Sequence, residues 1–152
     1  MNKSEEKFKE WLDSKKYPYI YVDQGTDTFS NFFKDFTKRP DFLVIVRNFG
    51  IIAVDVKEKN NREYKDFILD EEEVKKYLAF ERITKLPVWF VFCRREEEYK
   101  NWYWISLSKV LECSIKKSQA SGDEFRAINS SDCIIIQVGR GDGLSRLMDD
   151  MM

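Results

Sequence analysis

The stretch that decides the fold is residues 40–57, PDFLVIVRNFGIIAVDVK, in which two apolar runs flank a short connection. The runs cover residues 42–46 and 51–56, and the connection contains Asn48 and Gly50, residues typical of turns. Two strands joined by so short a connection predict an antiparallel hairpin. Because both runs are continuously apolar rather than alternating, we expect other elements to cover both faces of the hairpin.

The sequence outside the hairpin predicts further helices and strands. A helix is expected over residues 4–15, with Ser4 as its cap and Phe8, Trp11 and Leu12 as its apolar stripe. Strands are expected at residues 17–22, 88–93, 102–105 and 133–138, with a second helix at 71–83. A phenylalanine-rich stretch, 27–36, predicts a helical turn or two, 114–122 predicts a loop, and the tail after 140 predicts one weak helix. This order indicates an α/β domain with one mixed central sheet flanked by helices.

The composition narrows the chemistry that the chain can perform. Among 152 residues there is no histidine, which excludes Ser-His-Asp triads and histidine metal sites within the chain. The 26 basic and 27 acidic residues give a net charge of −1, so a strongly basic scaffold is excluded but a local basic groove is not. The three widely spaced cysteines and the charged N-terminal segment favour a cytoplasmic protein with reduced thiols and no membrane contact.

Three ionisable residues stand where a covered sheet should be apolar. Asp41 opens the first hairpin strand, and Asp55 and Lys57 close the second, two residues apart and therefore on one face. A connection of two or four residues would place Asp41 opposite Val56, on the wrong face. We therefore predict a connection of odd length or a bulge, so that Asp41 faces Asp55.

Two carboxylates and one amine at one end of a sheet indicate a hydrolytic metal site. Oxygen ligands without nitrogen or sulfur suit a hard cation such as Mg²⁺ or Mn²⁺. Such an ion polarises a phosphoryl oxygen and lowers the pKa of a bound water, while Lys57 can orient that water or neutralise developing charge. The expected reaction is hydrolysis of a phosphodiester bond.

The motif resembles the PD-(D/E)XK nuclease signature: Pro40-Asp41, thirteen residues, then Asp55-Val56-Lys57. The order of elements resembles the αβββαβ core of the restriction-endonuclease-like fold over residues 4–93, with additional strands and a tail over 94–152 in the same single domain. The resemblance implies Asp41, Asp55 and the Val56 carbonyl as metal ligands and Lys57 as the catalytic lysine.

The resemblance also implies two residues on neighbouring helices. A first-helix glutamate often joins such sites, and Glu5 is the candidate because it lies on the inward stripe, with Glu6 as the fallback. A polar residue on the helix after the motif is often present too, and Lys76 and Tyr77 are the nearest options.

Several alternatives remain open at this point. Asp41 can be an ordinary turn residue, Asp55 and Lys57 a weak surface ion pair, and Glu5 an ordinary first-turn acid. The leading hypothesis is a metal-dependent nuclease that acts on DNA rather than RNA. The second is a catalytically inactive nuclease-fold module that binds nucleic acid or a partner protein. A third is a nuclease that works only as a homodimer or in a larger assembly.

Basic residues around the motif are candidate phosphate ligands: Lys15, Lys16, Lys34, Lys38, Arg39, Lys59, Arg62 and Lys65.

Overall fold

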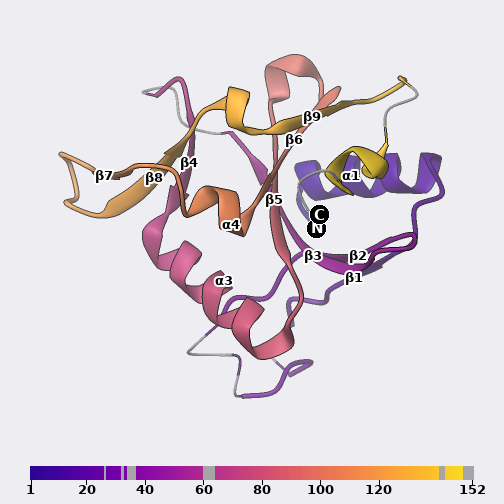
Figure 1. Ribbon diagram of the computed structural model, residues 1–152, viewed down its shortest axis with the longest axis horizontal. Coiled ribbons are helices and arrows are strands. Elements are labelled where there is room, and N and C mark those ends of the chain that lie inside the picture. The colour runs from indigo at the N-terminus through magenta and orange to yellow at the C-terminus, as the bar shows by residue number, and fades with distance from the viewer. Residues whose placement is uncertain (26, 32, 34–36, 60–63, 141–142, 149–152) are drawn as a thin grey trace.

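The computed structural model describes residues 1–25, 27–31, 33, 37–59, 64–140 and 143–148 (Figure 1). The helices are α1 (Lys3–Ser14), α3 (Glu71–Thr84) and α4 (Leu107–Val110), with short 3-10 turns η1 (Arg95–Glu97), η2 (Ser130–Asp132) and η3 (Leu144–Leu147). The strands are β1 (Tyr19–Tyr21), β2 (Phe42–Val46), β3 (Gly50–Glu58), β4 (Phe67–Asp70), β5 (Val88–Cys93), β6 (Asn101–Ser106), β7 (Ile115–Lys117), β8 (Glu124–Ile128) and β9 (Ile134–Gln137).

A mixed sheet forms the centre of the molecule. Within the described residues its strand order is β1-β2-β3-β5-β6-β9, and β3 and β5 run parallel while the other neighbours run antiparallel. The helix α3 makes the crossover between the parallel strands β3 and β5. The prediction of an α/β domain with one mixed central sheet flanked by helices is confirmed.

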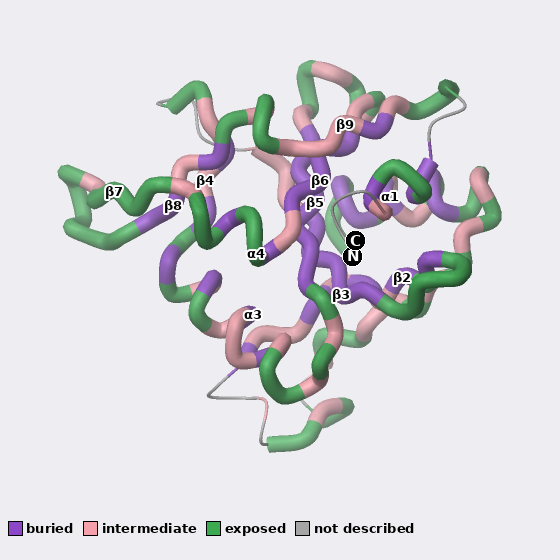
Figure 2. Tube along the Cα trace, viewed as in Figure 1, coloured by how far each residue is buried: buried purple, intermediate pink, exposed green. Residues whose placement is uncertain are grey.

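The two long helices cover opposite faces of this sheet (Figure 1). Phe8, Trp11 and Leu12 of α1 pack on one face, in a cluster with the β3 residues Ile52, Val54 and Val56. Val74, Tyr77 and Phe80 of α3 pack on the other face, in a cluster with Ala53 of β3. Burial is therefore nearly continuous along the middle strands (Figure 2), as the unbroken apolar runs predicted.

The hairpin register agrees with the prediction. Val46 pairs with Gly50 and Phe42 pairs with Val54, so the connection has three residues, 47–49. Asn48 adopts a positive φ of 67°, a conformation that asparagine tolerates in turns. The predicted odd-length connection is therefore confirmed, and Asp41 lies one residue before β2, beyond the paired register. The Asp41 N–H also donates to the Val54 carbonyl at 2.9 Å, so β3 still holds Asp41 beyond the end of β2.

Other parts of the chain differ from the sequence predictions. A second, three-stranded sheet, β4-β8-β7, and the short helix α4 were not predicted, and β7 lies in the stretch predicted as a loop. The cap of α1 is Asn2 rather than Ser4, because Asn2 and Glu5 form a reciprocal capping box. In the region of the predicted tail helix, residues 144–147 form the 3-10 turn η3, and residues 141–142 and 149–152 lie outside the described residues.

Some residues with a sequence-based prediction lie outside the described part of the chain. In the phenylalanine-rich stretch, Phe32 and Phe36 lie outside the described residues, as do Lys34 and Arg62 of the candidate phosphate ligands. No helix in the part of the chain that the structure describes is long and apolar enough to cross a membrane.

Candidate active site

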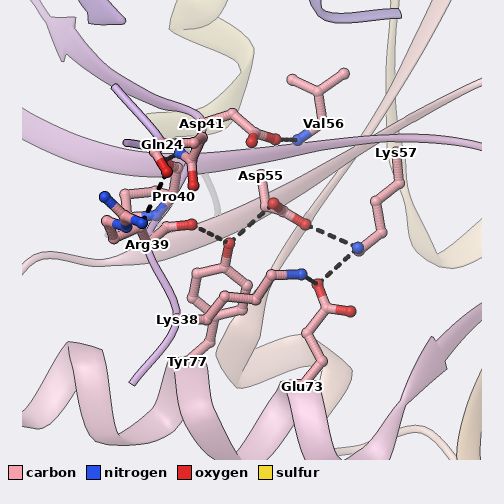
Figure 3. Close-up of polar contacts among 10 residues, drawn as sticks. All are labelled: Gln24, Lys38, Arg39, Pro40, Asp41, Asp55, Val56, Lys57, Glu73 and Tyr77. Carbon is pink, nitrogen blue, oxygen red and sulfur yellow. Dashed lines mark hydrogen bonds and ion pairs between the residues drawn. The ribbon is translucent and has the colours of Figure 1, made fainter. Parts of the chain in front are cut away.

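The three motif residues meet beyond the end of β2, beside the last part of β3 (Figure 3). Asp55 and Lys57 share the sheet face that α3 covers, and Lys57 Nζ lies 3.0 Å from Asp55 Oδ2. Asp41 reaches the same place from the other hairpin strand, where its Oδ2 accepts the Val56 N–H at 2.8 Å. The hairpin thus brings together residues that are fourteen and sixteen positions apart in the sequence.

The backbone N–H and C=O of Val56 point from β3 toward Asp41. The N–H of Ala53 donates to the carbonyl of Pro87, just before β5, and the N–H of Lys59 donates to the carbonyl of Cys93, at the end of β5. Consecutive residues of a strand point their backbone groups to alternate sides, and the N–H and C=O of one residue point the same way. The Val56 carbonyl therefore points away from β5, toward the side on which its N–H meets Asp41.

The helix α3 contributes two side chains that fix the charged residues (Figure 3). The fully buried Tyr77 hydroxyl donates to Asp55 Oδ1 at 2.8 Å and lies 3.1 Å from the Arg39 carbonyl oxygen. Glu73 Oε1 lies 2.6 Å from Lys57 Nζ and 2.7 Å from Lys38 Nζ. The side chain of Lys57 is consequently held between two carboxylates, one from the sheet and one from the helix.

Sequence reasoning missed Glu73 and did not single out Lys38 from the other basic residues. Of the two candidates it named on this helix, Tyr77 lies at the site, whereas Lys76 makes no hydrogen bond or ion pair to these residues in the described structure. A usable signal was present, because Glu73 is four residues before Tyr77 and residues at that spacing share a helix face.

Glu5 lies near the site but is partly engaged elsewhere. Its Oε2 accepts the Asn2 N–H at 2.9 Å in the capping box, and the residue is buried. Its charge contributes to raising the pKa of the Asp41 carboxyl, so the two side chains are close enough to interact. The fallback Glu6 is exposed on the outer side of α1.

The two motif carboxylates strongly perturb each other. Burial, followed by the charge of Asp55, raises the pKa of Asp41 to about 9. Burial alone would also raise the pKa of Asp55, but the Lys57 and Lys38 ammonium groups lower it below its usual value. Asp55 and Glu73 overcome the effect of burial on Lys57 and raise the pKa of its ammonium group. At neutral pH the apo site therefore has an ionised Asp55, a protonated Asp41 and a charged Lys57.

These residues fit a hard divalent cation. Among the described residues no hydrogen-bond donor is placed on the buried Asp55 Oδ2, and the Lys57 ammonium lies 3.0 Å from it. A cation beside Asp41 and Asp55 would favour the ionised form of Asp41, and the Val56 carbonyl faces the same side. No group of three or more acidic, cysteine or histidine side chains placed to hold a metal occurs among the described residues. Two carboxylates with water and substrate oxygens match the usual Mg²⁺ environment.

A groove of about 560 Å³ opens beside the site. Lys57 and Glu73 line it, together with Asn2 and Lys3 of the α1 end and the basic residues Lys59 and Arg95. The motif lysine is therefore accessible from solvent, while Asp55 lies behind it with a side chain only 4% exposed.

Comparisons with known proteins identify the fold. No protein-family model matches the sequence, and a search of curated proteins gave no match. A solved structure of Hjc, a Holliday junction resolvase from the archaeal hyperthermophile Archaeoglobus fulgidus, is similar with a TM-score of 0.54. The similarity covers 85% of this chain and 88% of that chain at 16% sequence identity. The chain has the restriction-endonuclease-like fold of that protein.

Proposed function

We propose that this protein is a metal-dependent nuclease of the PD-(D/E)XK superfamily that hydrolyses phosphodiester bonds of DNA. The observation that carries the proposal is the convergence of Asp41, Asp55 and Lys57 at the open end of the hairpin. The fold adds support, since the similar structure is that of a Holliday junction resolvase. A four-way DNA junction is therefore the first substrate to test, with linear duplex and single-stranded DNA beside it.

Asp41, Asp55 and the Val56 carbonyl would hold Mg²⁺ or Mn²⁺. When bound, such an ion polarises a phosphoryl oxygen and lowers the pKa of a coordinated water. The protein keeps both carboxylates in place: Tyr77 holds Asp55 Oδ1, and the Val56 N–H holds Asp41 Oδ2. Each carboxylate thus has one fixed oxygen, and the other can serve as a ligand.

Lys57 acts as a fixed cation in this proposal. Its ammonium group is charged at neutral pH because Asp55 and Glu73 raise its pKa, so it does not serve as a general base. It orients the attacking water and stabilises the negative charge that develops on the phosphoryl oxygens. Glu5 assists from α1, since one of its carboxylate oxygens is outside the capping bond to Asn2.

The test is cleavage of labelled DNA by the wild type, Lys57→Ala and Lys109→Ala, with Mg²⁺, Mn²⁺ or EDTA. Lys109 is the control because it is a partly exposed lysine on α4, paired with Glu112 at 3.8 Å, and does not line the groove. We expect cutting by the wild type and Lys109→Ala with either metal, none in EDTA, and none by Lys57→Ala.

Full activity of Lys57→Ala would contradict the proposed role of this site. If a folded wild type cuts none of these DNAs with either metal, the nuclease proposal is wrong, and the alternative of a catalytically inactive nuclease-fold module replaces it. The same assay should include RNA, which we expect to remain intact. Light scattering in parallel tests whether the active species is a homodimer.

A further inference from the structure

One carboxylate oxygen at the site holds two ammonium groups. Glu73 Oε1 lies 2.6 Å from Lys57 Nζ and 2.7 Å from Lys38 Nζ, so the two lysines converge on one point (Figure 3). Lys57 already has a second carboxylate, Asp55, at 3.0 Å. Lys38 has Glu73 as its one ion-pair partner among the described residues.

The four charged side chains form a row in which Lys38 is the most exposed. In the order of their contacts, Asp55 is 4% exposed, Lys57 is 23%, Glu73 is 16% and Lys38 is 41%. Lys38 therefore lies at the solvent end of a row that begins at the buried motif carboxylate. Its Nζ lies over the Tyr77 ring, 5.8 Å from the ring centroid, which favours the ammonium group on this side of α3.

Stability alone does not account for Lys38 in this position. An ion pair of a lysine this exposed contributes little to stability, because water screens it and the flexible stem loses entropy. Placing two ammonium groups on one oxygen also adds repulsion between them. That repulsion would fall if a second anion reached the lysines from the solvent side, and a phosphodiester oxygen is such an anion.

We propose that Lys38 is a substrate-binding residue, which Glu73 holds beside Lys57 so that its ammonium group meets a phosphodiester oxygen of the DNA backbone. This inference rests on the proposed function, and it adds a phosphate contact that the motif does not contain. As the DNA binds, the Lys38 ammonium turns from Glu73 to the phosphate oxygen, and Glu73 keeps its contact with Lys57. A lysine is a point charge without base recognition, so the contact is independent of DNA sequence.

The test is DNA binding in EDTA, where metal-dependent cutting is prevented, measured by fluorescence anisotropy over a series of salt concentrations. The variants are Lys38→Met, Lys38→Arg and the control Lys109→Met, whose side chain is 45% exposed and also paired with a glutamate. We expect Lys38→Met to bind a four-way junction about tenfold more weakly and to lower the slope of log K against log salt by about one. Lys38→Arg and Lys109→Met should keep the wild-type slope.

Thermal unfolding separates this role from a structural one, because Lys38→Met should unfold within a few degrees of the wild type. Wild-type affinity and salt slope in Lys38→Met, with intact binding and cutting by the wild type, would overturn this inference and leave the proposed function standing. A wild type that neither binds nor cuts DNA would overturn both. If Lys109→Met lowered the salt slope of DNA binding as much as Lys38→Met does, the inference about Lys38 would also be overturned. Any half-exposed lysine would then contribute equally to DNA binding.

Discussion

The helix α3 supplies carboxylates to two buried ionic clusters that are built in opposite ways. Glu71 meets Arg126 of β8, with Oε2 at 2.7 Å from Nε and Oε1 at 3.1 Å from Nη2. Arg126 Nη1 also donates to the carbonyls of Leu111 and Cys113, at 3.0 and 3.1 Å. Every charged oxygen of this pair has a partner, and both side chains are only 10% exposed.

The cluster two residues further along the helix is incompletely paired. The ammonium groups of Lys38 and Lys57 pair with Asp55 and Glu73, while Asp41 makes no ion pair in the described structure. No hydrogen-bond donor among the described residues is placed on Asp55 Oδ2, and burial together with the charge of Asp55 raises the pKa of Asp41 to about 9. Complete pairing is typical of a group that stabilises the fold, whereas a buried carboxyl group without an ionic partner is typical of a site that awaits a cation or a substrate.

The largest difference between the clusters should appear in catalysis. We expect Asp55→Ala to reduce cleavage about a thousandfold or more, because it removes a metal ligand and a partner of Lys57. Glu71→Gln should leave the cleavage rate of the folded protein within about twofold of wild type, since no site contact involves it. Initial rates on one labelled junction, normalised to folded protein, measure both. A comparable loss in the two variants would mean that the clusters do not differ in role.

The next largest effect should be a loss of stability when the Glu71–Arg126 pair is broken. Glu71→Gln leaves the Arg126 guanidinium buried without its counter-charge, so we expect a loss of about 3 kcal/mol in the free energy of unfolding. Urea unfolding followed by tryptophan fluorescence measures it. Arg126→Met, which removes the charge as well, is the companion variant. A loss below about 1 kcal/mol in Glu71→Gln would show that the pair is not the structural element described here.

A smaller effect is expected where the site depends on α3 for its shape. Tyr77→Phe removes the hydroxyl that lies between Asp55 and the Arg39 carbonyl. We expect a loss of about 1–2 kcal/mol in stability and about tenfold in cleavage, because Asp55 loses its fixed orientation. Phe80→Leu, a change in the same apolar cluster away from the charges, is the control and should affect stability only. Unchanged cleavage by Tyr77→Phe would show that the Tyr77 hydroxyl does not position Asp55 for catalysis.

The smallest effect is expected for the stability of Asp41→Asn in EDTA. Asp41 is mostly protonated at pH 7 in the apo protein, because burial and Asp55 raise its pKa to about 9. An asparagine resembles this neutral form, so the free energy of unfolding at pH 7 should change by less than about 1 kcal/mol, or rise slightly. Urea unfolding in EDTA checks this. A large loss would show that the Asp41 carboxylate stabilises the fold, as Glu71 does.

The comparison also explains what the sequence could predict. The hairpin and its odd connection were predictable, because both strands are continuously apolar and the motif residues at their ends depend only on local register. The contacts of Glu73 and Lys38 were not, because they depend on how α3 packs across the sheet. Arg126 was missed for a related reason: β8 is short and carries a charged residue whose partner is 55 positions away in the sequence. The functional roles of Asp41, Asp55, Val56, Lys57 and Glu5 remain predictions.

Titration calorimetry of Mn²⁺ into the wild type, Asp41→Asn, Asp55→Asn and Glu71→Gln, without DNA, tests whether the incompletely paired cluster binds a metal. We expect a site in the wild type and in Glu71→Gln, and loss of that site in both aspartate variants. Absence of Mn²⁺ binding by the folded wild type, or equal binding by all four proteins, would contradict the claim that the incompletely paired cluster is the metal centre of a nuclease.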